Sequence, residues 1–195
     1  EVDDNFRYQR EYSSEVYSHL TGYFSLFQGS TGVEREMSNF LSGQSSAQFF
    51  DQINAVLSGT PISGANVELT IDDELQQAAW KALGNNKGSV VAIDPKTGEI
   101  KALVSKPGFD ANLLASHSFA SSSSAYEELL TDPNDPLVNR AISGDQYHPG
   151  SVFKMVVAAA AFESGRFEPD SEFENPNFLP LPGSISTVQN ANDST

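Results

Sequence analysis

The sequence predicts a protein that combines α-helices with antiparallel strands, and three of its segments carry that prediction. The apolar runs 88–93 and 99–104 flank a turn that contains Pro and Gly, which indicates a β-hairpin. Residues 73–83 repeat apolar side chains with the helical period. A long apolar stretch after His148-Pro-Gly-Ser151 indicates a further helix. At ~150 residues per domain, the 195 residues suffice for one domain and part of another.

The N-terminal part is rich in aromatic residues and irregular up to about Ser45. It contains a capping-box pattern, Thr31-Gly-Val-Glu34, and Gly43 follows as a stop signal. A second capped pattern of apolar residues begins at Ser45. These patterns predict two short helices, over residues 33–41 and 47–57.

A stretch of Gly, Pro and Ser over residues 59–64 is typical of a linker, and the sequence pattern changes after it. We therefore expect a domain boundary there, with a small module over 1–64 and a second domain over 65–195. After the linker, Asp72 is placed to cap the helix over 73–83. The sequence further predicts a strand over 67–71, a polar loop over 116–125, and short helices over 127–130 and 138–142.

The helix predicted over 152–162 is apolar nearly all round, with Lys154 as the only charge in its body. A helix of this kind is usually buried on all sides. We therefore expect it at the centre of its domain, with Phe153, Val157 and Ala160 buried. On this expectation, Val157→Asp buries a carboxylate without a partner and unfolds a marginally stable domain.

Ser151 and Lys154 form the strongest candidate for a catalytic pair. Residues three apart lie on one helix face, so the amine can reach the hydroxyl. Burial and the positive end of the helix dipole favour the neutral amine, which can take a proton from the serine. Backbone amides at the helix start, including that of Ser151, can then stabilise an oxyanion. The pattern therefore predicts Ser151 as the nucleophile and Lys154 as the general base.

The Ser-x-x-Lys pattern alone is weak evidence, because a chain with this many serines and lysines contains about one such match by chance. The alternative is a Lys154 side chain at the rim of an ordinary core helix, with its amine in water. The three histidines, His19, His117 and His148, show no metal-ligand spacing, which favours unrelated surface or loop positions. No pair of carboxylates stands out for glycosidase chemistry.

Composition limits the classes of partner. The net charge is −15, from 26 acidic and 11 basic residues. A surface for nucleic acid or anionic lipid needs clustered Lys and Arg, so neither is expected as a partner. The absence of cysteine excludes disulfides, thiolate zinc ligands and a cysteine nucleophile. No window reaches the ~18 apolar residues of a membrane span, and no signal peptide opens the chain.

Several motifs, taken in order, resemble those of penicillin-binding proteins. Pro149-Gly-Ser-Val-Phe-Lys154, preceded by Leu137-Val-Asn-Arg-Ala-Ile142, looks like the start of their active site. Residues 92–105 resemble the first hairpin of their transpeptidase domain. Two N-terminal motifs are similar to class B enzymes of the actinobacterial penicillin-binding protein A type: Leu20-Thr-Gly-Tyr-Phe-Ser25 and Ser30-Thr-Gly-Val-Glu-Arg35.

The resemblance implies an α+β transpeptidase domain of the serine β-lactamase-like kind, an antiparallel sheet flanked by helices, with the Ser151 helix at its centre. Residues 1–64 would form a membrane-proximal module that does not bind penicillin. The implied reaction is attack of Ser151 on the D-Ala-D-Ala carbonyl of a peptidoglycan stem peptide. An amine of a neighbouring strand resolves the acyl-enzyme, whereas β-lactam antibiotics are trapped as slow acyl-enzymes. No cofactor is needed for this chemistry.

The resemblance also implies a location and further partners. It places the protein on the extracellular face of the bacterial cytoplasmic membrane, with a membrane anchor outside this chain and proteins of cell division or elongation as partners. Two other functions stay open at this point. One is a β-lactam sensor or division scaffold that keeps the serine helix without turnover, and the other is a non-catalytic interaction fragment. Turnover of a stem peptide separates the enzyme from both.

The sequence departs from the family pattern, which requires Ser-x-Asn and Lys-Thr/Ser-Gly after the nucleophile. Ser-x-Asn does not occur, and Lys96-Thr97-Gly98 lies upstream in the hairpin turn, where we interpret it as turn chemistry. His148 and Val152 stand where the family often has proline and threonine. We therefore expect the chain to be the front part of a longer enzyme, poorly active alone and acylated by penicillin far more slowly than the full-length protein.

Overall fold

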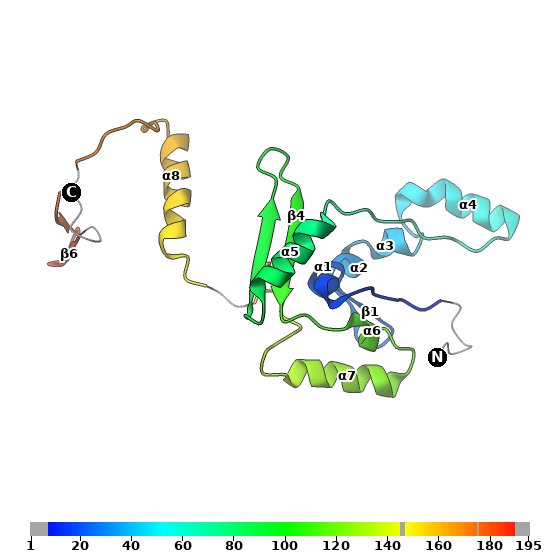
Figure 1. Ribbon diagram of the computed structural model, residues 1–195. Helices are drawn as coiled ribbons and strands as arrows, with labels where there is room; N and C mark the ends of the chain where they lie inside the picture. Colours follow the sequence, from blue (N-terminus) through cyan, green and yellow to red (C-terminus); the bar gives the residue numbers. More distant parts are fainter. Residues whose placement is uncertain (1–7, 145–146, 175, 190–195) are drawn as a thin grey trace. The chain divides into compact units, whose positions relative to one another are not determined.

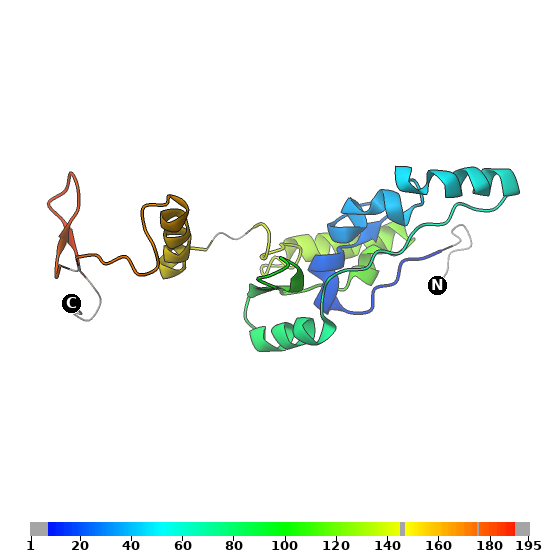
Figure 2. The ribbon, with the colours of Figure 1, turned by 90° about the horizontal axis from the view of Figure 1, so that it is seen from above.

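The computed structural model describes residues 8–144, 147–174 and 176–189 and divides the chain into two compact units, Glu1–Gln146 and Tyr147–Thr195 (Figures 1 and 2). The larger unit holds the helices η1 (Glu15–Tyr17), α1 (Ser18–Thr21), α2 (Gly32–Glu36), α3 (Ser38–Leu41), η2 (Ser46–Gln48), α4 (Phe49–Ser58), α5 (Asp73–Leu83), α6 (Ala111–Leu114) and α7 (Phe119–Thr131). Its strands are β1 (Phe24–Ser25), β2 (Gly29–Ser30), β3 (Gly88–Ile93) and β4 (Ile100–Lys106). The smaller unit holds η3 (Gly150–Val152), α8 (Phe153–Glu163), β5 (Leu179–Pro180) and β6 (Thr187–Val188).

The predicted hairpin is confirmed as the antiparallel pair β3–β4. Its turn depends on the Asp94 carboxylate, whose Oδ1 accepts hydrogen bonds from the amides of Lys96 and Thr97 at 2.7 and 3.2 Å. These amide donors lower the pKa of Asp94. Gly98 closes the turn with a φ of +76°, which a residue with a side chain rarely adopts.

Helix α5 is also confirmed, and it packs on β4 (Figure 1). Asp72 caps it as predicted, because its Oδ1 accepts the amide hydrogen of Leu75 at 3.0 Å. The fully buried Gln76 then joins α5 to two other elements. Its Nε2 donates to the carbonyls of Val16 and Leu103 at 3.0 and 2.8 Å, and its Oε1 accepts from the Leu103 amide at 2.8 Å. One side chain thereby connects η1, α5 and β4.

Residues from both sides of the predicted boundary at 64/65 share one core. Tyr23 and Phe109 belong to the same buried apolar cluster, together with α6. The Asn112 side chain makes two hydrogen bonds to the backbone of Tyr12. Its Oδ1 accepts from the Tyr12 amide at 2.8 Å, and its Nδ2 donates to the Tyr12 carbonyl at 2.9 Å. The division into 1–64 and 65–195 thus stays a prediction about domains, while the packing unites the two parts.

The predicted polar loop over 116–125 is wrong, since most of it belongs to α7. Ser118 caps this helix by accepting the amide hydrogen of Ser121. The hydroxyl oxygen of the fully buried Ser122 lies 3.0 Å from the Leu114 carbonyl oxygen and 2.7 Å from Oε1 of Gln28, and its one hydrogen can be donated to either acceptor. Partners far along the chain therefore stabilise a helix that its run of serines does not favour.

Three other predictions fail in detail. The segment over 67–71, expected as a strand, is not paired as one; its Thr70 hydroxyl donates to the Ile100 carbonyl of β4 at 2.8 Å. The helix over 33–41 is divided into α2 and α3, and the Thr31 hydroxyl accepts from the Tyr23 amide at 3.3 Å instead of capping. The segment 138–142 forms turns. By contrast, the helix over 47–57 is confirmed as η2 followed by α4, which ends at Gly59.

Gln76→Leu is expected to destabilise the larger unit by on the order of 3 kcal/mol, because it leaves buried backbone groups of two neighbouring elements without partners. Gln77→Leu is the matched control on the same helix. It removes one 3.2 Å hydrogen bond to the Tyr17 hydroxyl and costs less than about 1 kcal/mol. Urea unfolding followed by the fluorescence of Trp80 measures both losses, and equal losses would contradict the role given to Gln76.

Candidate active site

The structure places Ser151 and Lys154 at the start of one helical segment, as the sequence predicts. Ser151 lies in η3, and Lys154 lies in the first turn of α8, three residues further on. Gly150, with a φ of +54°, sets the chain direction just before the serine. The two residues therefore lie on adjoining turns, and both side chains are exposed.

The predicted burial of this helix is wrong within the described chain. Phe153 and Val157 are 54% and 55% exposed, and Ala160 is exposed as well. None of the described residues in the unit 147–195 is buried, because the short η3 and two pairs of strand residues supply no apolar layer to cover α8. Val157→Asp is consequently not expected to unfold this chain. Lys154 is exposed like its neighbours in the helix.

The tripeptide Lys96-Thr97-Gly98 lies in the exposed turn between β3 and β4. Its three residues take part in the hydrogen bonds and the left-handed backbone that close this turn. This placement agrees with the interpretation of Lys96-Thr97-Gly98 as residues that form the turn.

His19 is buried, contrary to the expectation of three surface or loop histidines. Its Nε2 lies 3.0 Å from the Pro107 carbonyl oxygen, and its ring meets Phe109 edge-on at 5.4 Å between centroids. Burial lowers the pKa of His19. His148 is exposed and His117 is half-buried. The residues that the structure describes contain no group of three His, Asp or Glu side chains suited to hold a metal ion.

Sequence reasoning missed how the segment 134–142 is held in place. The buried guanidinium of Arg140 donates to the carbonyls of Asn134, Asp135 and Val138 at 2.9 to 3.3 Å. The Arg140 amide donates to the Ser105 hydroxyl at 2.9 Å, which fixes the segment to β4. In the sequence, Arg140 followed by two apolar residues suggests a helix. The turn becomes apparent only from the backbone carbonyls that accept hydrogen bonds from Arg140 in the folded chain.

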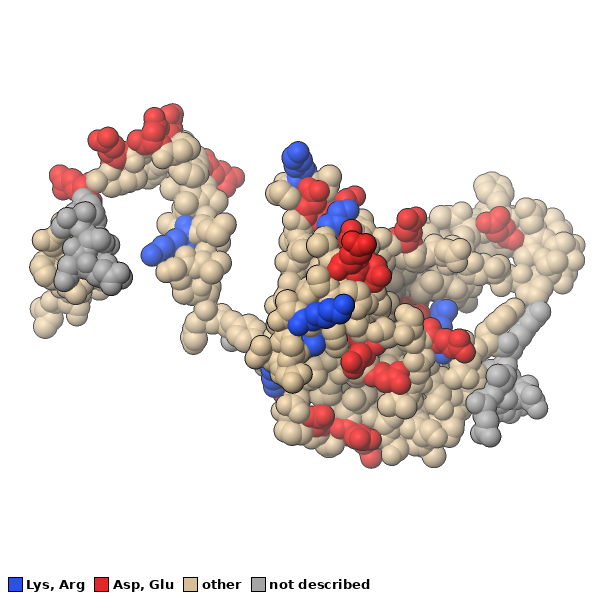
Figure 3. All heavy atoms as spheres, in the orientation of Figure 1, with Lys and Arg blue, Asp and Glu red and all other residues tan. Residues whose placement is uncertain are grey.

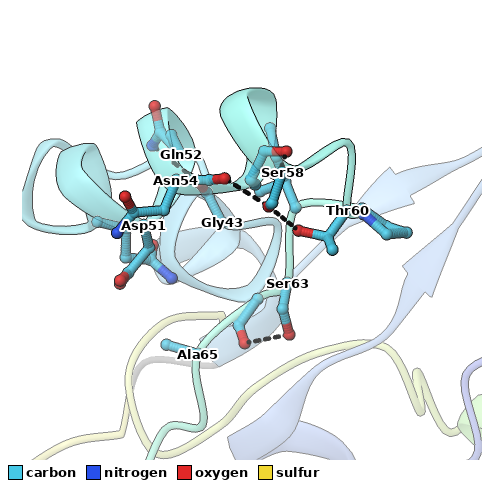
Figure 4. A pocket seen from close by; sticks show the side chains of 13 residues that line it. Gly43, Asp51, Gln52, Asn54, Ser58, Thr60, Ser63 and Ala65 are labelled. Atoms are coloured by element: carbon cyan, nitrogen blue, oxygen red, sulfur yellow. Dashed lines mark hydrogen bonds between the residues drawn. The ribbon is translucent and has the colours of Figure 1, made fainter.

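The described residues of the larger unit line pockets that are apart from the serine segment in sequence. One, of about 400 Å³, lies beside α4, where Ser58 donates to the Asn54 carbonyl and contacts the Thr60 hydroxyl (Figure 4). Another, of about 350 Å³, contains Trp80 and Lys106. Acidic side chains are scattered over the face of this unit shown in Figure 3. Among the described ranges, no helix has the length and apolar character needed to cross a membrane.

Two family models match the chain. The model of the penicillin binding protein transpeptidase domain matches residues 88–195, and that of the penicillin binding protein A dimerisation domain matches residues 1–67. The chain therefore belongs to the penicillin-binding protein transpeptidase family, and the predicted resemblance is confirmed. The described part of the domain has the predicted mixture of helices and antiparallel strands.

Individual relatives agree with this assignment. The chain is 42% identical to the peptidoglycan D,D-transpeptidase PbpA of Mycolicibacterium smegmatis over 97% of its residues, and 36% identical to MrdA of Escherichia coli over 80%. It is similar to the penicillin G acyl-enzyme complex of penicillin-binding protein A from M. tuberculosis, with a TM-score of 0.82, 39% identity and 99% coverage. The chain spans 39%, 25% and 45% of these three proteins, respectively.

The burial of His19 makes stability depend on pH. Because the pKa of His19 is lowered in the folded protein, the unfolded chain binds a proton more readily, so stability present above pH ~6.5 decreases as the pH falls below that ordinary value. His19→Gln should remove most of this decrease, since an amide can still donate to Pro107 and does not titrate. Urea midpoints at a series of pH values between about 5 and 7.5 test this, with His148→Gln as the exposed control. A wild-type decrease that persists unchanged in His19→Gln would contradict the assignment.

Proposed function

We propose that this chain supplies the nucleophile segment of a serine-type peptidoglycan D,D-transpeptidase. The observation that carries the proposal is the placement of Ser151 and Lys154 on adjoining turns at the start of α8, within the residues matched by the transpeptidase model. The names of the relatives, which are D,D-transpeptidases, and the penicillin acyl-enzyme of the M. tuberculosis protein support the same chemistry.

In the proposed reaction, the neutral Lys154 amine takes the proton of the Ser151 hydroxyl as its oxygen attacks the D-Ala-D-Ala carbonyl of a stem peptide. The backbone amide of Ser151 contributes to the stabilisation of the resulting oxyanion. The peptide bond then breaks, and the terminal D-Ala leaves with a proton on its amine. An amine of a second stem peptide attacks the acyl-enzyme, which releases Ser151 and forms the cross-link. No cofactor enters this sequence.

The exposure of α8 sets a requirement on this mechanism. A lysine acts as a base only in its neutral form, and water stabilises the charged form. The active enzyme must therefore cover Lys154 with other protein atoms or with bound substrate. We propose that β-lactams react with Ser151 in the same covered site, on the extracellular face of the cytoplasmic membrane, and that residues 1–64 form a membrane-proximal module there, held by a membrane anchor. Proteins of cell division or elongation are proposed as further partners.

In the intact protein, Lys154→Ala should lower the second-order rate constant for penicillin acylation by on the order of 10²–10⁴-fold, the usual contribution of a positioned general base. Ser151→Ala should abolish covalent labelling. Fluorescent penicillin at constant pH measures the rates, and circular dichroism confirms that each variant is folded.

Lys96→Ala is the matched control, because this lysine occupies an exposed turn and surface changes usually stay within about 0.5 kcal/mol. Its acylation rate should equal that of the wild type within about twofold. A variant set in which Lys96→Ala loses acylation and Lys154→Ala keeps it would overturn the site assignment.

A further inference from the structure

Helix α4, Phe49–Ser58, carries an apolar face that is exposed in the described chain. Its large apolar side chains are 39 to 79% exposed, and they are Phe49, Phe50, Ile53, Val56 and Leu57. At about 100° per residue, these side chains fall within an arc of roughly 120° with Ile53 at its centre. An apolar stripe of this width is the part of a helix that normally packs against another surface.

The opposite side of α4 faces its own chain. Ala55, which is buried, points about 160° away from Ile53. Gln52 holds the helix in place, because its Nε2 donates to the carbonyls of Gly43 and Ser45 at 2.8 and 3.1 Å. Helix α4 lies at the outer edge of the larger unit (Figure 1). Its apolar stripe therefore points outward, which is the reverse of an ordinary surface helix.

The segment that contains α4 is nearly free of charge. Asp51 is the only charged residue between Glu36 and Glu68, whereas 19% of the whole chain is charged. Asp51 itself points about 160° away from Ile53, outside the apolar arc. A chain with a net charge of −15 repels a second copy of itself wherever acidic groups meet. The α4 face is a region where two copies can approach without that repulsion.

The composition of α4 favours a second copy over a lipid surface. Helices that lie on membranes usually carry Lys and Arg on their polar face, and α4 contains neither. The family model that matches residues 1–67 is described as a dimerisation domain. That description agrees with a second copy as the partner, and it leaves the contacting surface open.

We propose that the apolar face of α4 packs against the same face of a second copy of this chain, with the two helices antiparallel about a twofold axis at Ile53. In this register, Phe49 of one copy meets Leu57 of the other, and Phe50 meets Val56. Each aromatic ring therefore packs against a branched aliphatic side chain. The same patch serves both copies, as a twofold interface requires, and the two helix dipoles oppose each other.

The size of the face sets the expected affinity. A helix of 10 residues is about 15 Å long, so its face is smaller than the ~800 Å² that each partner contributes to a standard interface. A weak dimer is expected, with a Kd on the order of 100 µM. Sedimentation equilibrium of the 195-residue chain from about 10 µM to 1 mM covers this range. A monomer throughout would overturn the proposal, as would binding to phosphatidylcholine vesicles without self-association.

Phe50→Lys and Val56→Glu test the register. Both positions are 75% exposed, so neither change should disturb the fold, which circular dichroism checks. Each variant alone should raise the Kd at least about tenfold, because it buries a charge without a partner. An equimolar mixture of the two should associate again, since the antiparallel register places the introduced lysine opposite the introduced glutamate. A mixture that stays monomeric would overturn the register.

Val157→Glu is the matched control, because α8 also exposes apolar side chains and can cause association of its own. This variant should leave the Kd unchanged. Loss of association in Val157→Glu, with none in Val56→Glu, would overturn the location on α4. The measurement does not involve Ser151, so its outcome is independent of the penicillin experiments.

Discussion

The larger unit depends on the side-chain amide of Gln76, which satisfies buried backbone groups of η1 and β4 at the same time. Buried backbone donors and acceptors need partners, and these two elements are too short or too distant in sequence to pair with each other. Asn112 and Arg140 repeat the arrangement, each bonding to the backbone of an irregular segment. The apolar cluster around Phe109 is small. Side-chain bonds to backbone thus determine how the N-terminal segment packs against the hairpin.

This dependence explains which elements could be predicted from sequence. The hairpin turn, the Asp72 cap and the start of α8 are encoded by neighbouring residues, so their patterns predict them correctly. The short helix predicted over 127–130 is confirmed as the end of α7. The N-terminal half of α7 could not be predicted, because its buried Ser122 depends on Gln28, 94 residues away. The helix expected over 138–142 is replaced by turns, because the Arg140 guanidinium donates to backbone carbonyls of the preceding turn.

In the candidate active site, too, the local features could be predicted from sequence and the features that depend on distant residues could not. The spacing of Ser151 and Lys154 is local, and the sequence predicts it together with the helix that carries them. Burial is a property of the surroundings, and the apolar pattern of α8 indicates only that the helix is suited to be covered. Phe153 and Val157 are exposed here, while the chain spans 39% of the length of its M. smegmatis relative. The described residues therefore leave Lys154 exposed as well.

The most direct test of the account is the location of the acyl group after reaction of the intact protein with penicillin G. Intact-mass spectrometry followed by peptide mapping identifies the modified residue. The account predicts one added penicilloyl group per chain, attached to Ser151, and none after Ser151→Ala. A penicilloyl group on any other serine, or undiminished labelling of Ser151→Ala, would contradict it.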